Sequence, residues 1–193
     1  MKVLIVFNHP APYKVKLFNE ISKIVDLDVI FEREKASDRP SDFYAENNIQ
    51  FNAMILKGCY LGKENTFTGK VRKYIKENHC KYNLIIMNGY STIAEMKAIS
   101  FMRKHKIKFG LYINGGIIKK DNFIKAKLKR KYISSASYYF SPCDEASNYL
   151  VHYGANKDSI YTYPYSTFFA KDVLDRPLTN EQKDKLKKEY NLP

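Results

Sequence analysis

A continuous apolar run near the start of the chain ends abruptly at two prolines, and this pattern constrains the fold more than any other feature. Residues 3–7 read VLIVF, which is typical of a strand buried on both faces of a parallel sheet. Pro10 and Pro12 end the strand, because proline cannot donate a ladder hydrogen bond and restricts the residue before it. Val15 and Phe18 follow at helical spacing. Strand, loop and helix form the first half of a βαβ unit, and ligands bind in such loops.

The rest of the chain repeats this alternation of apolar runs and helical patterns. Further strands are predicted at 27–31, 51–56, 82–87, 107–113, 137–140 and 159–163. Helices are predicted at 67–78, between 91 and about 105, and at 119–136, 144–153 and 183–190. This order predicts an α/β fold of the Rossmann-like, doubly wound type with a mainly parallel sheet. The turn-rich segment 32–48 is predicted to be a long loop, and long loops in compact domains are often functional.

The net charge of +13 narrows the classes of partner. It favours an anionic partner, such as nucleic acid, an acidic membrane or a phosphorylated substrate. Three cysteines without a CxxC pair, Cys59, Cys80 and Cys143, favour a reduced, cytosolic protein. No apolar segment approaches the length that spans a bilayer, so any membrane contact is predicted to be peripheral. With 193 residues, the chain is long enough for one domain with a substantial core.

Three loops that contain glycine or proline follow predicted parallel strands, at 10–14, 88–91 and 114–116. The carboxyl ends of parallel strands share one edge of the sheet, so these loops are predicted to line one crevice. None of them is a GxGxxG or Walker A motif, and a tightly bound dinucleotide or nucleoside triphosphate is therefore not expected. Gly115 and Gly116 give a ligand room to approach, although a plain turn is the more frequent explanation of such a pair.

His9 stands at the end of the first predicted strand, where a general acid or base could act. A lone histidine is more often structural, so both roles stay open. The sequence contains no cysteine–histidine spacing typical of a metal site and no GxSxG motif, so no metal is expected.

A dense run of cations occupies the helix predicted at 119–136. Its members are Lys119, Lys120, Lys125, Lys127, Lys129, Arg130 and Lys131. Ile124, Leu128 and Tyr132 recur every four residues and predict a narrow apolar seam between the cations. The run could bind nucleic acid phosphates, lie on anionic lipid headgroups, or form an ordinary solvated helix face. Because no nucleic-acid recognition motif accompanies it, the lipid interpretation is preferred and no nucleic-acid partner is expected.

Four segments in order resemble one family of enzymes. They are HPAPYKVKLFNE at 9–20, LIIMNGYST at 84–92, INGGIIKKDNFIKAKLKRKYISSASYYFSP at 113–142 and HYGANKDSIYTYPYSTF at 152–168. Together they resemble the N-terminal half of bacterial family 4 glycosyltransferases, which have the GT-B architecture. The resemblance extends from Met1 to about Phe169.

This resemblance implies a division of labour between two Rossmann-like domains that face each other. In GT-B enzymes the N-terminal domain binds the acceptor, the C-terminal domain binds the nucleotide-sugar donor, and the family retains anomeric configuration without a bound metal. Residues 1–169 would then be the acceptor-binding domain, and 170–193 a connector towards a C-terminal donor-binding domain. The resemblance implies no cofactor for this domain, with the nucleotide sugar as co-substrate of the full-length enzyme. This fragment alone is expected to be inactive.

The same resemblance implies a biological setting. The acceptor would be a glycan or a lipid-linked sugar, and the pathway would be the synthesis of surface or capsular polysaccharide or of lipopolysaccharide. The location would be cytoplasmic, peripheral on the inner face of the plasma membrane, where the basic run would contact anionic lipid. The alternative is a non-catalytic Rossmann-like or flavodoxin-like binding module that acts on membrane or nucleic acid through its basic face.

Individual residues can be assigned by their position in these segments. His9 is the catalytic candidate. The acceptor-binding candidates are Pro12, Tyr13, Lys14, Gly89, Tyr90, Asn114, Gly115 and Gly116. Relatives often carry an acidic residue or histidine where Asn114 stands, and an amide cannot take a proton, so a general base is not expected there. The prolines of the first loop replace a glycine pair found in many relatives, so direct cradling of a donor phosphate by that loop is not expected.

Overall fold

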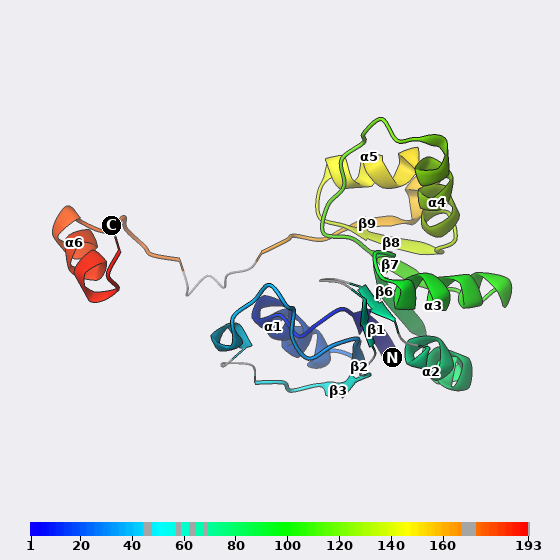
Figure 1. Cartoon of the computed structure of the whole chain (residues 1–193), viewed down its shortest axis with the longest axis horizontal. Helices are drawn as coiled ribbons and strands as arrows, with labels where there is room; N and C mark the ends of the chain where they lie inside the picture. The colour runs from blue at the N-terminus through cyan, green and yellow to red at the C-terminus, as the bar shows by residue number, and fades with distance from the viewer. Residues whose placement is uncertain (45–47, 57–58, 62–64, 68, 167–172, 193) are drawn as a thin grey trace.

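The structure is a computed structural model and describes residues 1–44, 48–56, 59–61, 65–67, 69–166 and 173–192. A seven-stranded sheet forms its centre, in the order β3-β2-β1-β6-β7-β8-β9 (Figure 1). The strands are β1 (Lys2–Phe7), β2 (Asp26–Phe31), β3 (Asn52–Ile55), β6 (Leu84–Asn88), β7 (Gly110–Tyr112), β8 (Tyr138–Ser141) and β9 (Ile160–Thr162). Every neighbouring pair in this sheet is parallel, which confirms the predicted Rossmann-like, doubly wound fold.

Helices cover the two faces of the sheet unequally (Figure 1). The helices are α1 (Pro12–Ser22), α2 (Lys70–Asn78), α3 (Ile93–Lys104), α4 (Phe123–Ile133), α5 (Asp144–His152) and α6 (Asn180–Glu189). On one face, α1 packs Val15 and Phe18 against β1 and β2. On the other face, α2 to α5 share one core cluster with the alternate residues of the strands, Leu4 and Val6 among them. This alternation follows from the two-residue period of a strand, which sends successive side chains to opposite faces.

The prediction for the segment before α2 was wrong in one respect. A small antiparallel hairpin, β4 (Cys59–Leu61) and β5 (Asn65–Phe67), stands where a loop and the first turn of a helix were expected. Helix α2 therefore begins at Lys70 rather than at residue 67. The hairpin contacts α3 and is separate from the main sheet.

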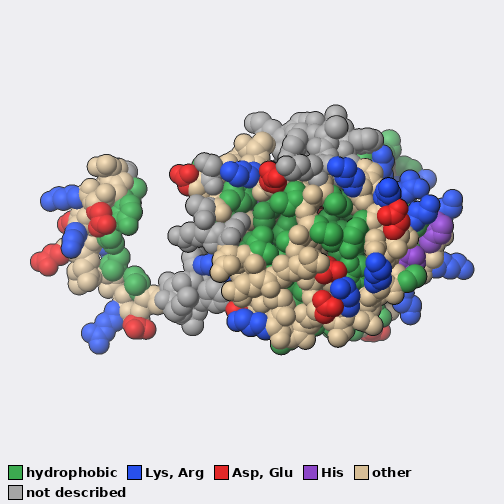
Figure 2. All heavy atoms as spheres, turned by 90° about the horizontal axis from the view of Figure 1, so that it is seen from below, with side chains coloured by type: hydrophobic (Ala, Val, Ile, Leu, Met, Phe, Trp, Pro, Cys, Tyr) green, Lys and Arg blue, Asp and Glu red, His purple; other side chains and the backbone are tan. Residues whose placement is uncertain are grey.

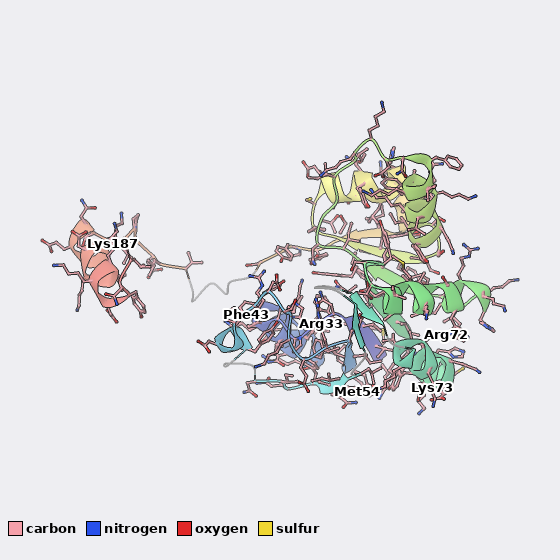
Figure 3. All side chains as sticks on the ribbon, in the orientation of Figure 1. Arg33, Phe43, Met54, Arg72, Lys73 and Lys187 are labelled. Atoms are coloured by element: carbon pink, nitrogen blue, oxygen red, sulfur yellow. The ribbon has the colours of Figure 1, made fainter. Side chains whose placement is uncertain are left out.

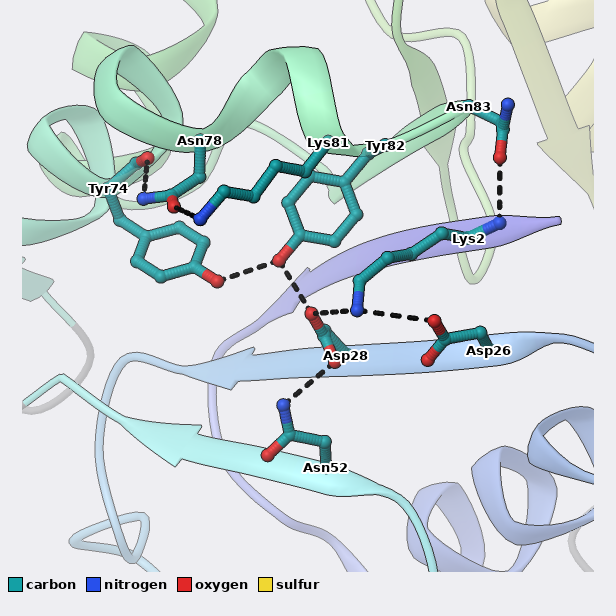
Figure 4. Close-up of polar contacts among 9 residues, drawn as sticks. All are labelled: Lys2, Asp26, Asp28, Asn52, Tyr74, Asn78, Lys81, Tyr82 and Asn83. Carbon is teal, nitrogen blue, oxygen red and sulfur yellow. Dashed lines mark hydrogen bonds and ion pairs between the residues drawn. The ribbon is translucent and has the colours of Figure 1, made fainter.

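A polar network connects the amino ends of the central strands (Figure 4). The predicted loops lie at the other edge of the sheet, where the strands end. Asp28 is buried on β2 and accepts hydrogen bonds from Asn52 (2.8 Å) and from the Tyr82 hydroxyl (2.6 Å), with Lys2 Nζ at 3.4 Å. Burial alone would raise the pKa of Asp28, but the hydrogen bonds from Tyr82 and Asn52 and the charge of Lys2 lower it below its ordinary value. Because the Asp28 carboxylate finds its hydrogen-bond and ionic partners within the fold, we interpret this network as structural.

Edge strand β3 lies on the side of the molecule that Figure 2 shows, and hydrophobic side chains gather at the centre of that face. Ile55 of β3 is exposed, and Met54, labelled in Figure 3, is half-buried.

Helix α6 lies apart from the body of the molecule (Figure 1) and buries none of its residues. The expected domain boundary at residues 169–170 lies outside the described residues. None of the helices in the described ranges has the length and hydropathy that crossing a bilayer requires.

Candidate functional site

The three predicted loops lie at one edge of the sheet. Strands β1, β6 and β7 are neighbours and run parallel, so the segments that follow them meet at the carboxyl edge. The winding of the sheet reverses between β1 and β6, and ligands bind outside such a reversal in open α/β sheets. The topology therefore confirms where the loops lie, and their side chains decide what the site can do.

A polar cavity of about 210 Å³ opens beside the carboxyl end of β1. Its lining comes from the segments that follow β1, β2 and β6, namely Asn8, His9, Arg33, Ala36, Asp38, Arg39, Ser91 and Thr92. Arg33 is buried on the segment that leads from β2 to the short helix at Ser41–Tyr44, where Phe43 lies (Figure 3). Arg39 is exposed beside Asp38, with a closest approach of 4.0 Å. Two arginines against one aspartate make this cavity suited to an anionic ligand.

Neither arginine was singled out from the sequence. The segment 32–48 was predicted only as a long loop with a possible function, and nothing in its composition marks which of its cations turns inward. The strand pairing supplies that information. The backbone N–H of Arg33 donates to the Asn8 carbonyl at 3.1 Å, which continues the β1–β2 ladder beyond β2 and fixes Arg33 beside His9.

His9, the catalytic candidate, lines this cavity. Its Nδ1 lies 3.1 Å from the Tyr44 hydroxyl, and its backbone N–H donates to Asn8 Oδ1 at 2.8 Å. Burial, and then the charge of Arg33, lower the pKa of His9 to about 4. The imidazole is therefore neutral near pH 7, where it can exchange hydrogen bonds with a hydroxyl group but is a weak base.

Two buried glutamates lie beneath the cavity. The Thr92 hydroxyl donates to Glu32 at 3.0 Å, while the backbone N–H groups of Ser91 and Thr92 donate to Glu95 at 2.7 and 3.0 Å. Burial, followed by the charge of Glu95, raises the pKa of Glu32, and burial also raises the pKa of Glu95. The pair therefore retains a proton near neutral pH, and the arginines dominate the charge of the cavity.

Lys14, one of the acceptor-binding candidates, turns its ammonium group towards the interior of the protein. The side chain is 1% exposed. Its Nζ donates to the Tyr112 hydroxyl and to Asn114 Oδ1, the latter at 3.2 Å. The rings of Tyr112 and Tyr165 lie 4.6 and 4.9 Å from it, and burial lowers its pKa to about 8. Lys14 thus connects the first loop to the third and holds these two loops in position.

The other acceptor-binding candidates are spread over the three loops. Pro12 begins α1, and Tyr13 follows it, half-buried. Asn114 and Gly115 are exposed at the edge of the sheet. Gly89 has a φ of +83°, a left-handed conformation that favours glycine and aims the chain from β6 towards α3.

Tyr90 and Gly116 take part in packing. The Tyr90 ring stacks on Tyr132 with centroids 5.8 Å apart, and its hydroxyl lies 2.8 Å from that of Tyr149. A side chain at Gly116 would place a Cβ 2.5 Å from the Tyr149 ring, so only glycine fits there. These contacts hold the third loop against α5 and turn Tyr90 away from the cavity beside His9.

The predicted membrane-contact residues divide into two groups. Lys129 is tied inward by a 2.7 Å ion pair with Asp121, and its side chain is only 15% exposed. The remaining cations of the basic run are exposed, and they are Lys119, Lys120, Lys125, Lys127, Arg130 and Lys131. Among the described residues, no three histidine, cysteine, aspartate or glutamate side chains are grouped so as to hold a metal ion.

No family model matches this chain, and no curated protein matches it in sequence. Solved structures do match. HepE from Anabaena, in complex with UDP-glucose, matches with a TM-score of 0.64 at 14% identity, over 99% of this chain and 50% of that protein. UDP-GlcNAc 2-epimerase from Methanocaldococcus jannaschii, in complex with UDP-GlcNAc and UDP, matches with a TM-score of 0.57 at 22% identity, over 84% of this chain and 46% of that enzyme.

The UDP-GlcNAc 2-epimerase from Neisseria meningitidis, bound to UDP-GlcNAc, is similar as well, with a TM-score of 0.53 at 17% identity. This chain spans about half the length of each of these proteins. At such identities the likeness concerns the fold, which is that of one half of a GT-B architecture.

Proposed function

We propose that this chain is the acceptor-binding half of a retaining glycosyltransferase related to bacterial family 4. The full-length enzyme would move a sugar from a nucleotide-sugar donor to a glycan or a lipid-linked acceptor, in the synthesis of surface polysaccharide or lipopolysaccharide. The donor would bind to a second domain beyond Pro193, for which residues 170–193 form the connector. We infer the N-terminal, acceptor-side assignment from the resemblance of the four sequence segments to that family.

The polar cavity beside His9 is the observation that carries this proposal. It lies at the reversal point of the sheet, and its polar lining, Asn8 and Ser91 among it, suits the hydroxyl groups of a sugar. Arg33 and Arg39 favour an acceptor that also carries a phosphate or carboxylate group. A phosphate-linked lipid carrier or an acidic sugar satisfies that requirement.

We assign to this half of the enzyme the role of positioning the acceptor. His9 is neutral at neutral pH, and Asn114 cannot accept a proton, so neither is a strong base. We propose that His9 and the arginines fix the acceptor so that one hydroxyl faces the donor sugar. Holding two reactants in reactive geometry is a large part of catalysis in transfer reactions.

A second candidate is half of a nucleotide-sugar epimerase, because several similar structures are UDP-GlcNAc 2-epimerases. An epimerase inverts one stereocentre of the sugar and needs no separate acceptor. A transferase instead releases the nucleotide and extends an acceptor. The two candidates therefore differ in where the sugar is found after the reaction.

Calorimetric titration with a nucleotide sugar tests which half this chain is. Residues 1–193 are expected to show no saturable binding of UDP-glucose or UDP-GlcNAc up to about 1 mM, which corresponds to about −4 kcal/mol. The longer protein that continues beyond Pro193 is expected to bind one of them more tightly. Micromolar binding of either nucleotide sugar by residues 1–193 would contradict the acceptor-side assignment.

A further inference from the structure

Exposed hydrophobic side chains concentrate at one end of α4. Phe123 is 80% exposed, Ile124 is 77% exposed and Ile117 is 71% exposed. Ile118 and Leu128 are exposed as well. We call these five side chains, Ile117, Ile118, Phe123, Ile124 and Leu128, the apolar tip. Single exposed hydrophobic residues are ordinary on a protein surface, but a contiguous group marks an interaction site.

The predicted apolar seam of this helix, formed by Ile124, Leu128 and Tyr132, is buried only at one end. Tyr132 and Ile133, in the last turn, reach the core, whereas Ile124 and Leu128 are exposed. Phe123, Ile124 and Leu128 stay exposed, and none of the described elements covers them. Burial inside this chain does not explain them.

The apolar tip is held in place by specific contacts. Asn122 caps α4, because its side chain accepts a hydrogen bond from the Lys125 backbone N–H at 2.8 Å. Asp121 is paired with Lys129 at 2.7 Å and accepts a hydrogen bond from the hydroxyl of Tyr153, the residue that directly follows α5. The start of α4 is thus anchored to α5, and the exposed side chains are presented by a supported helix end.

Cations flank these hydrophobic side chains. Asp121 is the only acidic residue between 114 and 133, and Lys129 already neutralises it. The exposed cations nearby are Lys119, Lys120, Lys125, Lys127, Arg130 and Lys131. A hydrophobic partner protein would need an equally strong negative rim to match this charge. An anionic bilayer supplies both requirements at once, since its headgroups attract the cations and its hydrocarbon accepts the hydrophobic side chains.

We propose that the apolar tip inserts Phe123 and Ile124 into the surface of an anionic lipid bilayer, while the flanking cations bind headgroups. Ile117 and Ile118 follow directly on Asn114–Gly116, so the tip adjoins the carboxyl edge of the sheet. Bilayer docking does not depend on the proposed function. Only its consequence does, namely that the acceptor is carried on a lipid and reaches the site from the membrane.

The absence of tryptophan from the chain allows a direct test. In Phe123→Trp, the single indole reports its own surroundings. Its emission is expected to shift to shorter wavelength with vesicles of phosphatidylcholine and phosphatidylglycerol, and brominated lipid is expected to quench it. The matched control is Ile24→Trp, at a position 82% exposed beyond the end of α1, which is expected to show neither change. Equal responses of the two variants, or none from Phe123→Trp, would overturn the proposal.

Co-sedimentation with the same vesicles measures separately what the hydrophobic side chains and the cations contribute to binding. The double variant Phe123→Ser with Ile124→Ser is expected to bind at least about 10-fold more weakly than the original chain, with unchanged circular dichroism. Lys125→Glu with Lys127→Glu is expected to lose the preference for anionic over neutral vesicles and the sensitivity to salt. Unaltered vesicle binding by both variants overturns the proposal. So does self-association or RNA binding that disappears with the double serine variant while vesicle binding persists.

These outcomes stay separate from those of the proposed function. If vesicle binding fails but the longer protein still transfers sugar to a soluble acceptor, the docking proposal falls and the function stands. If vesicle binding succeeds and no sugar is transferred, the docking proposal stands and the proposed function falls.

Discussion

The proposed function predicts that replacing His9 by alanine, in a protein that also contains the proposed donor-binding domain, lowers kcat/KM for sugar transfer by about 100-fold. His9 lines the polar cavity, and Tyr44 holds its Nδ1 at 3.1 Å, so its other ring nitrogen is free to contact an acceptor hydroxyl. His9→Asn is expected to retain part of the activity, because an amide also forms hydrogen bonds. Steady-state kinetics at several acceptor concentrations measures both effects.

The pH profile separates positioning from proton transfer. The lowered pKa of His9, about 4, means that the imidazole stays uncharged as the pH falls from about 8 to about 5.5. His9 is therefore expected to contribute no acid limb in that range. The original protein and His9→Ala are expected to share one profile, because any limb there comes from other groups, such as the buried pair Glu32 and Glu95. His105→Ala, which changes an exposed histidine elsewhere, serves as the control. An acid limb near pH 6.5 that His9→Ala abolishes would contradict the positioning role.

Gly116→Ala is expected to destabilise the chain by roughly 2 kcal/mol, the usual cost of overpacking. The new Cβ would lie 2.5 Å from the Tyr149 ring, which must move and break its hydrogen bond with Tyr90. In a chain of this size the melting temperature should fall by roughly 4–8 °C. Thermal and urea unfolding followed by circular dichroism measure the change.

A double-mutant cycle identifies the cause of that loss. In Tyr149→Ala the ring is gone, so adding Gly116→Ala is expected to cost much less than it does in the original chain. Equal costs in the two backgrounds would show that the contact between Gly116 and Tyr149 does not determine the conformation of the third loop.

The fold was predictable because each central strand carries its own signal. Residues 3–7 and 27–31 are continuous apolar runs, and both are strands buried on two faces. Helix α3 was predictable for a related reason, since Ala94, Ala98 and Met102 recur at helical spacing and all lie in the core. The hairpin of β4 and β5 was missed because its three-residue strands are too short to show a period.

The site was less predictable, because sequence patterns do not show which element covers which side chain. Lys14 has the same appearance in the sequence as any exposed lysine, yet aromatic rings from β7 and the segment after β9 enclose it. Arg33 faces a cavity only because the β1–β2 ladder continues past Asn8. The periodicity of α4 correctly identified Ile124 and Tyr132 as members of one stripe, but it could not show that Tyr132 is buried while Ile124 stays exposed.

Sugar transfer by a protein that also contains the proposed donor-binding domain is the decisive test of the proposed function. That protein is incubated with radiolabelled UDP-glucose or UDP-GlcNAc and with lipid-linked or soluble glycan acceptors, and the label is then located by chromatography. We expect the label to move to an acceptor with release of the nucleotide, and residues 1–193 alone to transfer none. Label that stays on the nucleotide as an epimerised sugar, or turnover by residues 1–193 alone, would contradict the proposed function.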